Sequence, residues 1–115
     1  MARDLKTNKD IDDFIAKVIK EAHHHAPWVE HIIQPLADEV RKRINLGQDT
    51  VEVYERNGNL ARTCWVTIAN KRYVFTYDYQ GKKIDLKDRT LRGHLMDSFD
   101  NNTTTAKVIS AAARL

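Results

Sequence analysis

The first 49 residues carry apolar side chains at helical spacing. The stripe over residues 11–26 follows the i, i+3, i+4 rule and predicts an amphipathic helix, which ends before Pro27 because proline disfavours helical geometry in the preceding residue. A second stripe over residues 29–44 predicts another helix, and Pro35 inside it predicts a kink or a division of that helix. The pattern therefore predicts a helical layer over residues 1–49.

Beyond this layer, apolar and polar residues alternate, as is typical of half-buried strands. Three tight-turn sequences predict four strands joined as an antiparallel β-meander: Asn57-Gly58, Asn70-Lys71 and Gln80-Gly81. Two-residue loops at these turns set Cys64 between Val51 and Tyr77, and they set Phe75 opposite Leu86. The apolar side chains then share one face, which we expect to form the core: Val51, Cys64, Val66, Ile68, Phe75, Tyr77, Ile84 and Leu86.

The last 26 residues, 90–115, predict a turn region followed by a helix. Apolar spacing over residues 90–99 fits a short helix that Gly93 weakens, so the conformation of this part stays open. Residues 105–115 predict the last helix. Together the patterns predict a single two-layer α+β domain over residues 1–115, with the N-terminal helices and the C-terminal helix packed on one face of a four-stranded antiparallel meander at residues 50–89.

One short stretch between the meander and the last helix carries a family resemblance. Ser98-Phe99-Asp100-Asn101-Asn102-Thr103 resembles small uncharacterised proteins encoded on integron gene cassettes, and the resemblance covers the C-terminal third of the chain. It implies a bacterial protein of α+β architecture that is encoded by a mobile gene and often self-associates. It assigns no activity and transfers no catalytic residue.

Composition narrows the class of protein further. Apolar residues make up 42% and charged residues 30% of the chain, with 4 glycines and 2 prolines, which excludes collagen-like and low-complexity sequences. One cysteine cannot form an intrachain disulfide. No apolar run approaches the roughly 20 residues of a membrane span, and the first residues lack an apolar secretory signal. We therefore expect a cytoplasmic protein with no membrane partner.

The positive charge of +3 follows the second half of the chain. Residues 1–49 hold 8 of the 19 basic and 9 of the 16 acidic side chains, which leaves 11 basic and 7 acidic ones for residues 50–115. Nucleic-acid binding is one interpretation, and a charged edge strand that discourages aggregation is the other. The candidate phosphate contacts are Lys82, Lys83, Lys87, Arg89 and Arg92.

The sheet face opposite the predicted core, here called the outer face, carries large rings among polar residues. Water alone does not favour Trp65 and Tyr54 there, so a segment from residues 90–99, a second subunit or a ligand is expected to cover them. We expect a homodimer, because one patch can pair with itself. The interface candidates are Tyr54, Trp65, Thr67, Val74 and Thr76.

Candidate chemistry is sparse. The run His23-His24-His25 lacks the i, i+4 spacing of a zinc helix, so it indicates a polar helix end; a metal or acid–base site and a pH-sensitive interface are the alternatives. Cys64 is expected to be a buried, inert thiol. We predict no catalytic residue, no metal and no cofactor. The leading hypothesis is a non-enzymatic binding module that self-associates through the outer face; the alternatives are a nucleic-acid binder, and a small enzyme or ligand carrier with a pocket between helices and sheet.

Overall fold

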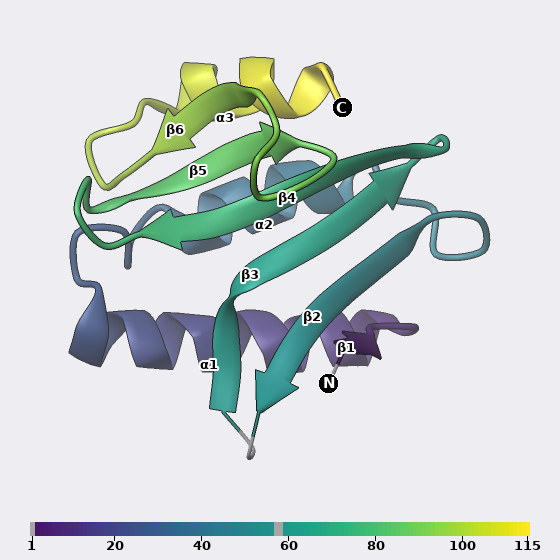
Figure 1. The fold of residues 1–115 in the computed structure, drawn as a ribbon, viewed down its shortest axis with the longest axis horizontal. Helices are drawn as coiled ribbons and strands as arrows, with labels where there is room; N and C mark the ends of the chain where they lie inside the picture. The colour runs from purple at the N-terminus through teal and green to yellow at the C-terminus, as the bar shows by residue number, and fades with distance from the viewer. Residues whose placement is uncertain (1, 57–58) are drawn as a thin grey trace.

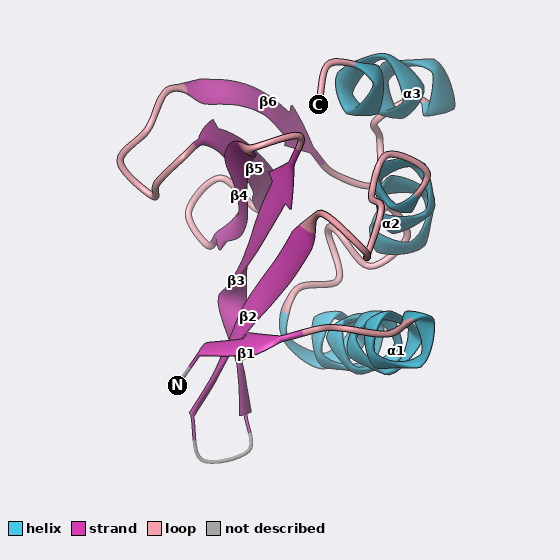
Figure 2. Ribbon diagram, turned by 90° about the vertical axis from the view of Figure 1, so that its right-hand side faces the viewer, coloured by secondary structure: helices cyan, strands magenta, loops and turns pink. Residues whose placement is uncertain are grey.

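The protein forms an antiparallel sheet with three helices on one side. The computed structural model describes residues 2–56 and 59–115, and side chains at 3–54 and 63–115. Within these residues, six strands follow the order β1-β2-β3-β4-β5-β6, and Figure 2 shows all three helices on the same side of them. In chain order the elements are β1 (Ala2–Asp4), α1 (Asn8–His25), α2 (Ile33–Arg41), β2 (Thr50–Arg56), β3 (Asn59–Ile68), β4 (Lys71–Asp78), β5 (Lys83–Asp88), β6 (Leu95–Phe99) and α3 (Thr105–Ala113) (Figure 1).

The α+β class and the antiparallel sheet are confirmed, but the four-stranded meander is wrong because each edge gains a strand. β1 pairs with β2 before α1 begins, and its three residues are too few to show an alternating pattern. β6 replaces the turn or short helix expected at residues 90–99 and pairs with β5. In this pairing Phe99 lies opposite Ile84 and is only 1% exposed, so burial of its ring favours the strand over the helix.

Local sequence explains where the helices begin and end. Thr7 caps α1 by accepting a hydrogen bond from the backbone N–H of Asp10, whose carboxylate accepts one from Thr7 in return. The second helical segment is divided, because residues 27–32 form turns and α2 begins at Ile33. Pro35 consequently lies in the first turn of α2, where a missing N–H costs no intrahelical hydrogen bond.

The register of the meander is partly as predicted. Phe75 lies opposite Leu86, but Cys64 lies opposite Phe75 instead of Tyr77. The reason is the turn, which has Ala69 and Asn70 at its centre with φ of 50° and 70°, one residue earlier than expected. An error of one residue in the turn moves the register by two, which leaves every side chain on its expected face.

The β2–β3 ladder also departs from the predicted register. Val51 lies opposite Val66 instead of Cys64, and the ladder is irregular between Val53 and Glu55. The turn expected at Asn57-Gly58 lies outside the described residues.

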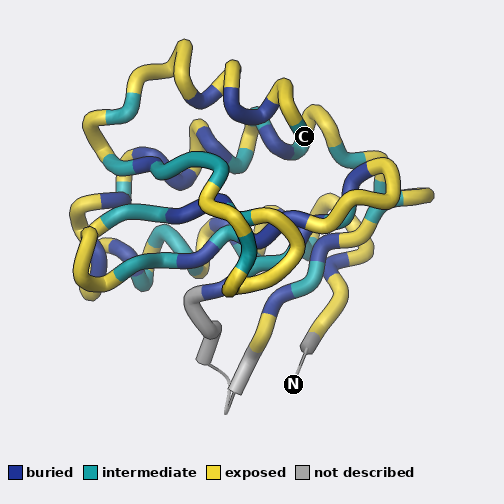
Figure 3. Tube along the Cα trace, turned by 45° about the horizontal axis from the view of Figure 1, so that its top comes forward, coloured by how far each residue is buried: buried dark blue, intermediate teal, exposed yellow. Residues whose placement is uncertain are grey.

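The predicted apolar face packs against the helices, as expected. Residues of this face and of the helix stripes belong to one cluster, and Figure 3 shows how buried and exposed positions alternate along the chain.

The outer face is also covered at its centre, where Val74 is fully buried. The β5–β6 connection folds across β4 (Figure 1), and the backbone N–H of Arg89 donates to the carbonyl of Arg72. Gly93 permits this fold, because a Cβ there would collide with the Asp88 carbonyl oxygen.

Candidate functional site

A large cavity lies between the helices and the sheet. Its volume is about 670 Å³, and its wall comes from α1, α2 and the inner faces of β2 to β5. Most of the lining is apolar, with Phe14 and Val18 from α1 and Phe75 from β4 among its members. These three side chains are only partly buried although they belong to the core cluster, because each has the hollow on one side. The core is therefore incompletely filled near α1.

A split in the sheet accounts for this hollow. The β3–β4 ladder begins with the pair Thr63–Thr76, whereas β4 continues beyond it and pairs Tyr77 and Asp78 with β5. β3 meanwhile continues in the other direction beside β2 as far as Asn59. Figure 1 shows the two strands diverging below their shared ladder. Thr63 and Thr76 line the cavity at the point where the strands part, although they belong to the outer face.

Polar groups gather in the cavity wall near the C-terminal end of α1. Glu21 and His25 are one turn apart on α1 and line the cavity together with Tyr77 and Tyr79. The two tyrosine rings lie 4.9 Å apart in an edge-to-face arrangement. Burial raises the pKa of Tyr77, and the neighbouring Tyr79 and Asp78 raise it further, so the Tyr77 hydroxyl keeps its proton at neutral pH.

Arg41 lines the cavity from α2, and its charge is already compensated. Its guanidinium donates to the Asp12 carboxylate at 2.5 Å and to the Asn8 side chain at 3.3 Å, both on the first turns of α1. Arg41 thus joins α2 to the beginning of α1, at the opposite end of that helix from Glu21 and His25. The cavity is therefore lined by a paired cation, Arg41, near the beginning of α1 and by the carboxylate of Glu21 and the imidazole of His25 near its end.

Cys64 also lies in the cavity wall. Burial raises the pKa of its thiol to about 12, so it stays protonated and a poor nucleophile at neutral pH. The raised pKa agrees with the expected inert thiol, but the residue is partly exposed where a buried one was expected. Its neighbours across the strands are Val53 and Phe75.

The stretch from Ser98 to Thr103 holds one wall of the cavity in place. Asn101 makes three hydrogen bonds to the α1–α2 connection: its side-chain amide donates to the Pro27 carbonyl at 2.8 Å, its side-chain oxygen accepts from the His31 N–H at 2.9 Å, and its backbone N–H donates to the Trp28 carbonyl at 2.9 Å. This connection carries Ala26 and Val29 of the cavity lining. The residues that carried the family resemblance therefore position part of the cavity.

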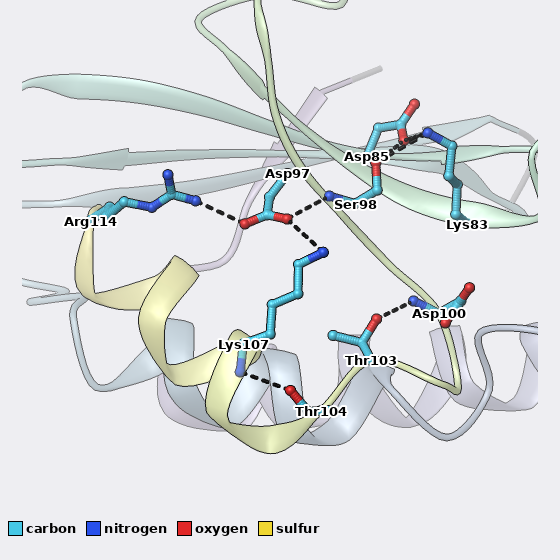
Figure 4. Close-up of polar contacts among 9 residues, drawn as sticks. All are labelled: Lys83, Asp85, Asp97, Ser98, Asp100, Thr103, Thr104, Lys107 and Arg114. Atoms are coloured by element: carbon cyan, nitrogen blue, oxygen red, sulfur yellow. Dashed lines mark hydrogen bonds and ion pairs between the residues drawn. The ribbon is translucent and has the colours of Figure 1, made fainter.

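A polar network fixes β6 between β5 and α3 (Figure 4). Asp97 on β6 accepts from Arg114 at 2.8 Å and pairs with Lys107 at 3.2 Å. On the outer face, Asp85 is bound by Lys83 at 3.1 Å and by the Ser98 hydroxyl at 3.0 Å. A smaller hollow of about 390 Å³ lies beside this network. Its two lysines, Lys83 and Lys107, are already paired with carboxylates, so the network serves packing.

The interface candidates of the outer face are only partly accessible. Tyr54 is 41% exposed, and Trp65 and Thr67 are partly buried. Val74 and Thr76 are buried within the chain itself. The Arg72 guanidinium lies over the Trp65 ring, 5.7 Å from its centroid. Self-association through this face stays a prediction, and it rests on the accessible residues of the patch.

The candidate phosphate contacts lie at opposite ends of β5. Lys82 lies at the β4–β5 turn with its ammonium 4.3 Å from the centroid of the Trp28 ring, and Lys83 is bound to Asp85 and Ser98. At the other end, Lys87 donates to the Leu91 carbonyl at 3.0 Å, Arg89 faces Asp88 at 3.9 Å, and Arg92 is exposed. Nucleic-acid binding stays a prediction, and these side chains do not form one continuous patch.

The three histidines are exposed, and their rings lie in a row: the ring centroids of His23 and His24 are 5.3 Å apart and those of His24 and His25 are 6.3 Å apart. Nδ1 of His23 lies 2.8 Å from the Glu30 carboxylate, whereas His25 lines the cavity. Among the residues that the structure describes, no group of three or more His, Cys, Asp or Glu side chains is placed to hold a metal ion. In the same part of the chain, no helix is long and apolar enough to cross a bilayer.

Fold and cavity together define an α+β protein with a partly open apolar hollow between its helix layer and its sheet. A family model described as "Integron cassette protein VCH_CASS1 chain" matches residues 11–109, so the chain belongs to this family of integron cassette proteins. The match spans most of the chain, which corrects the expectation that the resemblance is confined to the C-terminal third. A search of curated proteins found no match.

Proposed function

We propose that this integron cassette protein is a non-enzymatic binding module that holds a small apolar molecule between its helices and its sheet. The observation that carries the proposal is the cavity of about 670 Å³ with a mostly apolar wall. Ligand sites in proteins typically have volumes of about 300–1,000 Å³ and combine apolar walls with a few polar groups. An apolar ligand would gain free energy by leaving water, and the half-buried rings of the wall would gain contacts.

The cavity can be tested with a neutral fluorescent probe. N-phenylnaphthylamine should bind with a blue shift and enhanced emission, because the wall is apolar. Bound probe should also raise the midpoint of thermal unfolding, because a ligand that binds only the folded state stabilises it. Absence of both effects would contradict the proposal.

A matched pair of variants separates binding in the cavity from adsorption on the surface. Val18→Trp puts a large ring into the hollow and should weaken probe binding at least tenfold, whereas Ala16→Trp puts the same ring on the exposed side of α1 and should leave binding unchanged. Equal effects of the two variants would show that the probe binds elsewhere.

We propose self-association as a second function of the same module, through the accessible part of the outer face. Tyr54 is 41% exposed on β2, and its neighbour across the sheet edge is the short strand β1. Exposed aromatic rings within a polar rim are typical of interface centres. Light scattering at about 100 μM should then give a dimer mass, because even a micromolar dimer is populated at that concentration. Tyr54→Glu should return a folded monomer, and a monomeric parent protein would refute this function.

A further inference from the structure

The outer face of the sheet is stepped, because a segment of the chain covers one half of it. The β5–β6 connection, residues 89–94, crosses β4 on the side of the sheet away from the helices (Figure 2) and is here called the ridge. Its backbone is held down by the hydrogen bond from the Arg89 N–H to the Arg72 carbonyl at 2.9 Å. The Lys87 ammonium holds it at a second point, where it donates to the Leu91 carbonyl at 3.0 Å. The Leu91 side chain is 46% exposed, so the ridge carries an accessible apolar group.

The other half of the outer face is formed by β1, β2 and β3 and is here called the open half. One row of paired residues crosses the sheet from Asp4 through Glu52 and Trp65 to Val74. Val74, under the ridge, is completely buried, whereas Trp65 is only partly buried and Tyr54 on the open half is 41% exposed. The face therefore places accessible aromatic rings beside a raised segment that carries an accessible leucine.

The two halves also differ in charge. The open half carries two carboxylates and one guanidinium: Asp4, Glu52 and Arg72. The ridge and the residue before it carry one carboxylate and two guanidiniums: Asp88, Arg89 and Arg92. Arg3 on β1 lies opposite the buried Val53 and so belongs to the inner face. The open half is therefore net negative, and the ridge is net positive.

Two copies of such a face can pair about a two-fold axis in two ways. If the axis crosses the strands, each half meets its own copy, so the two ridges collide and like charges face each other. If the axis runs along the strands between β3 and β4, the ridge of each copy meets the open half of the other, and opposite charges face each other. Only the second arrangement agrees with both the step and the charges.

The face is large enough for a stable dimer. The extents of the protein are 34 × 33 × 26 Å, and Figure 1 looks along the shortest of these axes onto the outer face. Stable complexes of standard size bury about 800 Å² on each partner. Most of this face would therefore take part in the contact.

We propose that two copies of the chain associate with the ridge of each copy on the open half of the other, about a two-fold axis along the strands. This inference rests on the proposed self-association and adds which surfaces meet. Leu91 then packs against the rings of Tyr54 and Trp65 in the second copy, at the centre of each contact. The guanidiniums of Arg89 and Arg92 lie near the carboxylates of the second copy and favour this arrangement over the other.

A matched pair of variants tests the apolar contact. Leu91→Glu puts a carboxylate on the ridge and should raise the Kd of the dimer at least tenfold, measured by light scattering over a dilution series. Ile109→Glu makes the same kind of change on α3, in the helix layer, at a residue that is 47% exposed, and it should leave the Kd unchanged. Far-UV circular dichroism checks that both variants are folded.

Reversal of charge tests which halves meet. One double variant, Asp4→Lys with Glu52→Lys, makes the open half basic, and a second, Arg89→Glu with Arg92→Glu, makes the ridge acidic. Each alone should raise the Kd about tenfold, because both contacts of its homodimer then join like charges. An equimolar mixture of the two should form heterodimers with a Kd close to that of the parent, because both contacts again join opposite charges.

A control and the parent protein separate the arrangement from self-association itself. Asp13→Lys with Asp38→Lys changes the net charge equally at exposed positions of α1 and α2, and the Kd should stay unchanged. A parent that is monomeric at about 100 μM would refute self-association and this arrangement together. A dimeric parent would overturn the arrangement alone if the open-half reversal left its Kd unchanged, if the mixture formed no heterodimer, or if the control variants on the helices weakened it equally.

Discussion

Two phenylalanines with the same side chain but different surroundings give the sharpest test of the hollow core. Phe99 on β6 is 1% exposed and lies outside the large cavity, although it borders the smaller hollow beside β6. Phe75 on β4 belongs to the predicted core face, yet it is partly buried and lines the cavity. Truncating a buried phenylalanine to alanine costs about 3–5 kcal/mol, so we expect this loss for Phe99→Ala.

Phe75→Ala should cost less, because one side of the ring already faces the hollow. The ring gives up contacts on one side only, and the change enlarges an existing cavity instead of creating a new one. We therefore expect a loss of about 1–2 kcal/mol. The difference of about 1–4 kcal/mol between the two variants measures how far the core is filled around each ring.

Urea unfolding followed by far-UV circular dichroism measures both free energies of unfolding. With a urea dependence of about 1–3 kcal/mol/M, the two variants should differ in midpoint by roughly 1 M. Phe75→Ala should also keep or increase the affinity for N-phenylnaphthylamine, whereas Phe99→Ala should not increase it. If the two substitutions cost the same, Phe75 is packed on all sides in solution, and the reasoning from the cavity fails.

Three further predictions follow from particular contacts. Asn101→Ala should lower the free energy of unfolding by about 1–3 kcal/mol and weaken probe binding, because it removes two side-chain hydrogen bonds to the α1–α2 connection. Asn102→Ala is the control, and calorimetry and probe titration compare the two variants. Thr7→Val should cost about 1 kcal/mol in thermal unfolding, since it removes the hydroxyl that caps α1 through the Asp10 N–H. The pKa of Cys64 is raised to about 12, so the folded state holds the thiol proton more tightly than the unfolded state does. The free energy of unfolding, measured by urea titration, should therefore fall as the pH rises from about 9 towards 12, and this fall should be smaller in Cys64→Ala.

The sequence predicted the faces of the sheet better than its register. Alternation places side chains on faces, and alternation survives any even slip of the strands. Turn position is a weaker signal: Asn70 was expected at the first central position, but the turn sets Ala69 there with φ of 50°, a conformation that alanine rarely adopts. The edge strands were missed because β1 is short and β6 has apolar residues at helix-like spacing.

The cavity could be anticipated only as one of several alternatives. Apolar patterning says which side chains face inwards, but the hollow depends on how far β3 and β4 diverge, which is a property of the whole sheet. A signal for its polar end was nevertheless present. Glu21 and His25 lie three and seven residues after Val18, on the apolar stripe of α1, where a charged and a polar residue interrupt the pattern.

The six residues that carried the family resemblance connect the fold to the proposed site. Ser98 belongs to the Asp85 network that fixes β6, Phe99 fills the core, and Asn101 holds the α1–α2 connection. That connection brings Trp28 under Lys82, and so sets the β4–β5 turn with Tyr79 against the end of α1. Binding of a probe in the cavity should therefore depend on residues of this stretch that do not line it, and their substitution should lower the affinity because it shifts the wall.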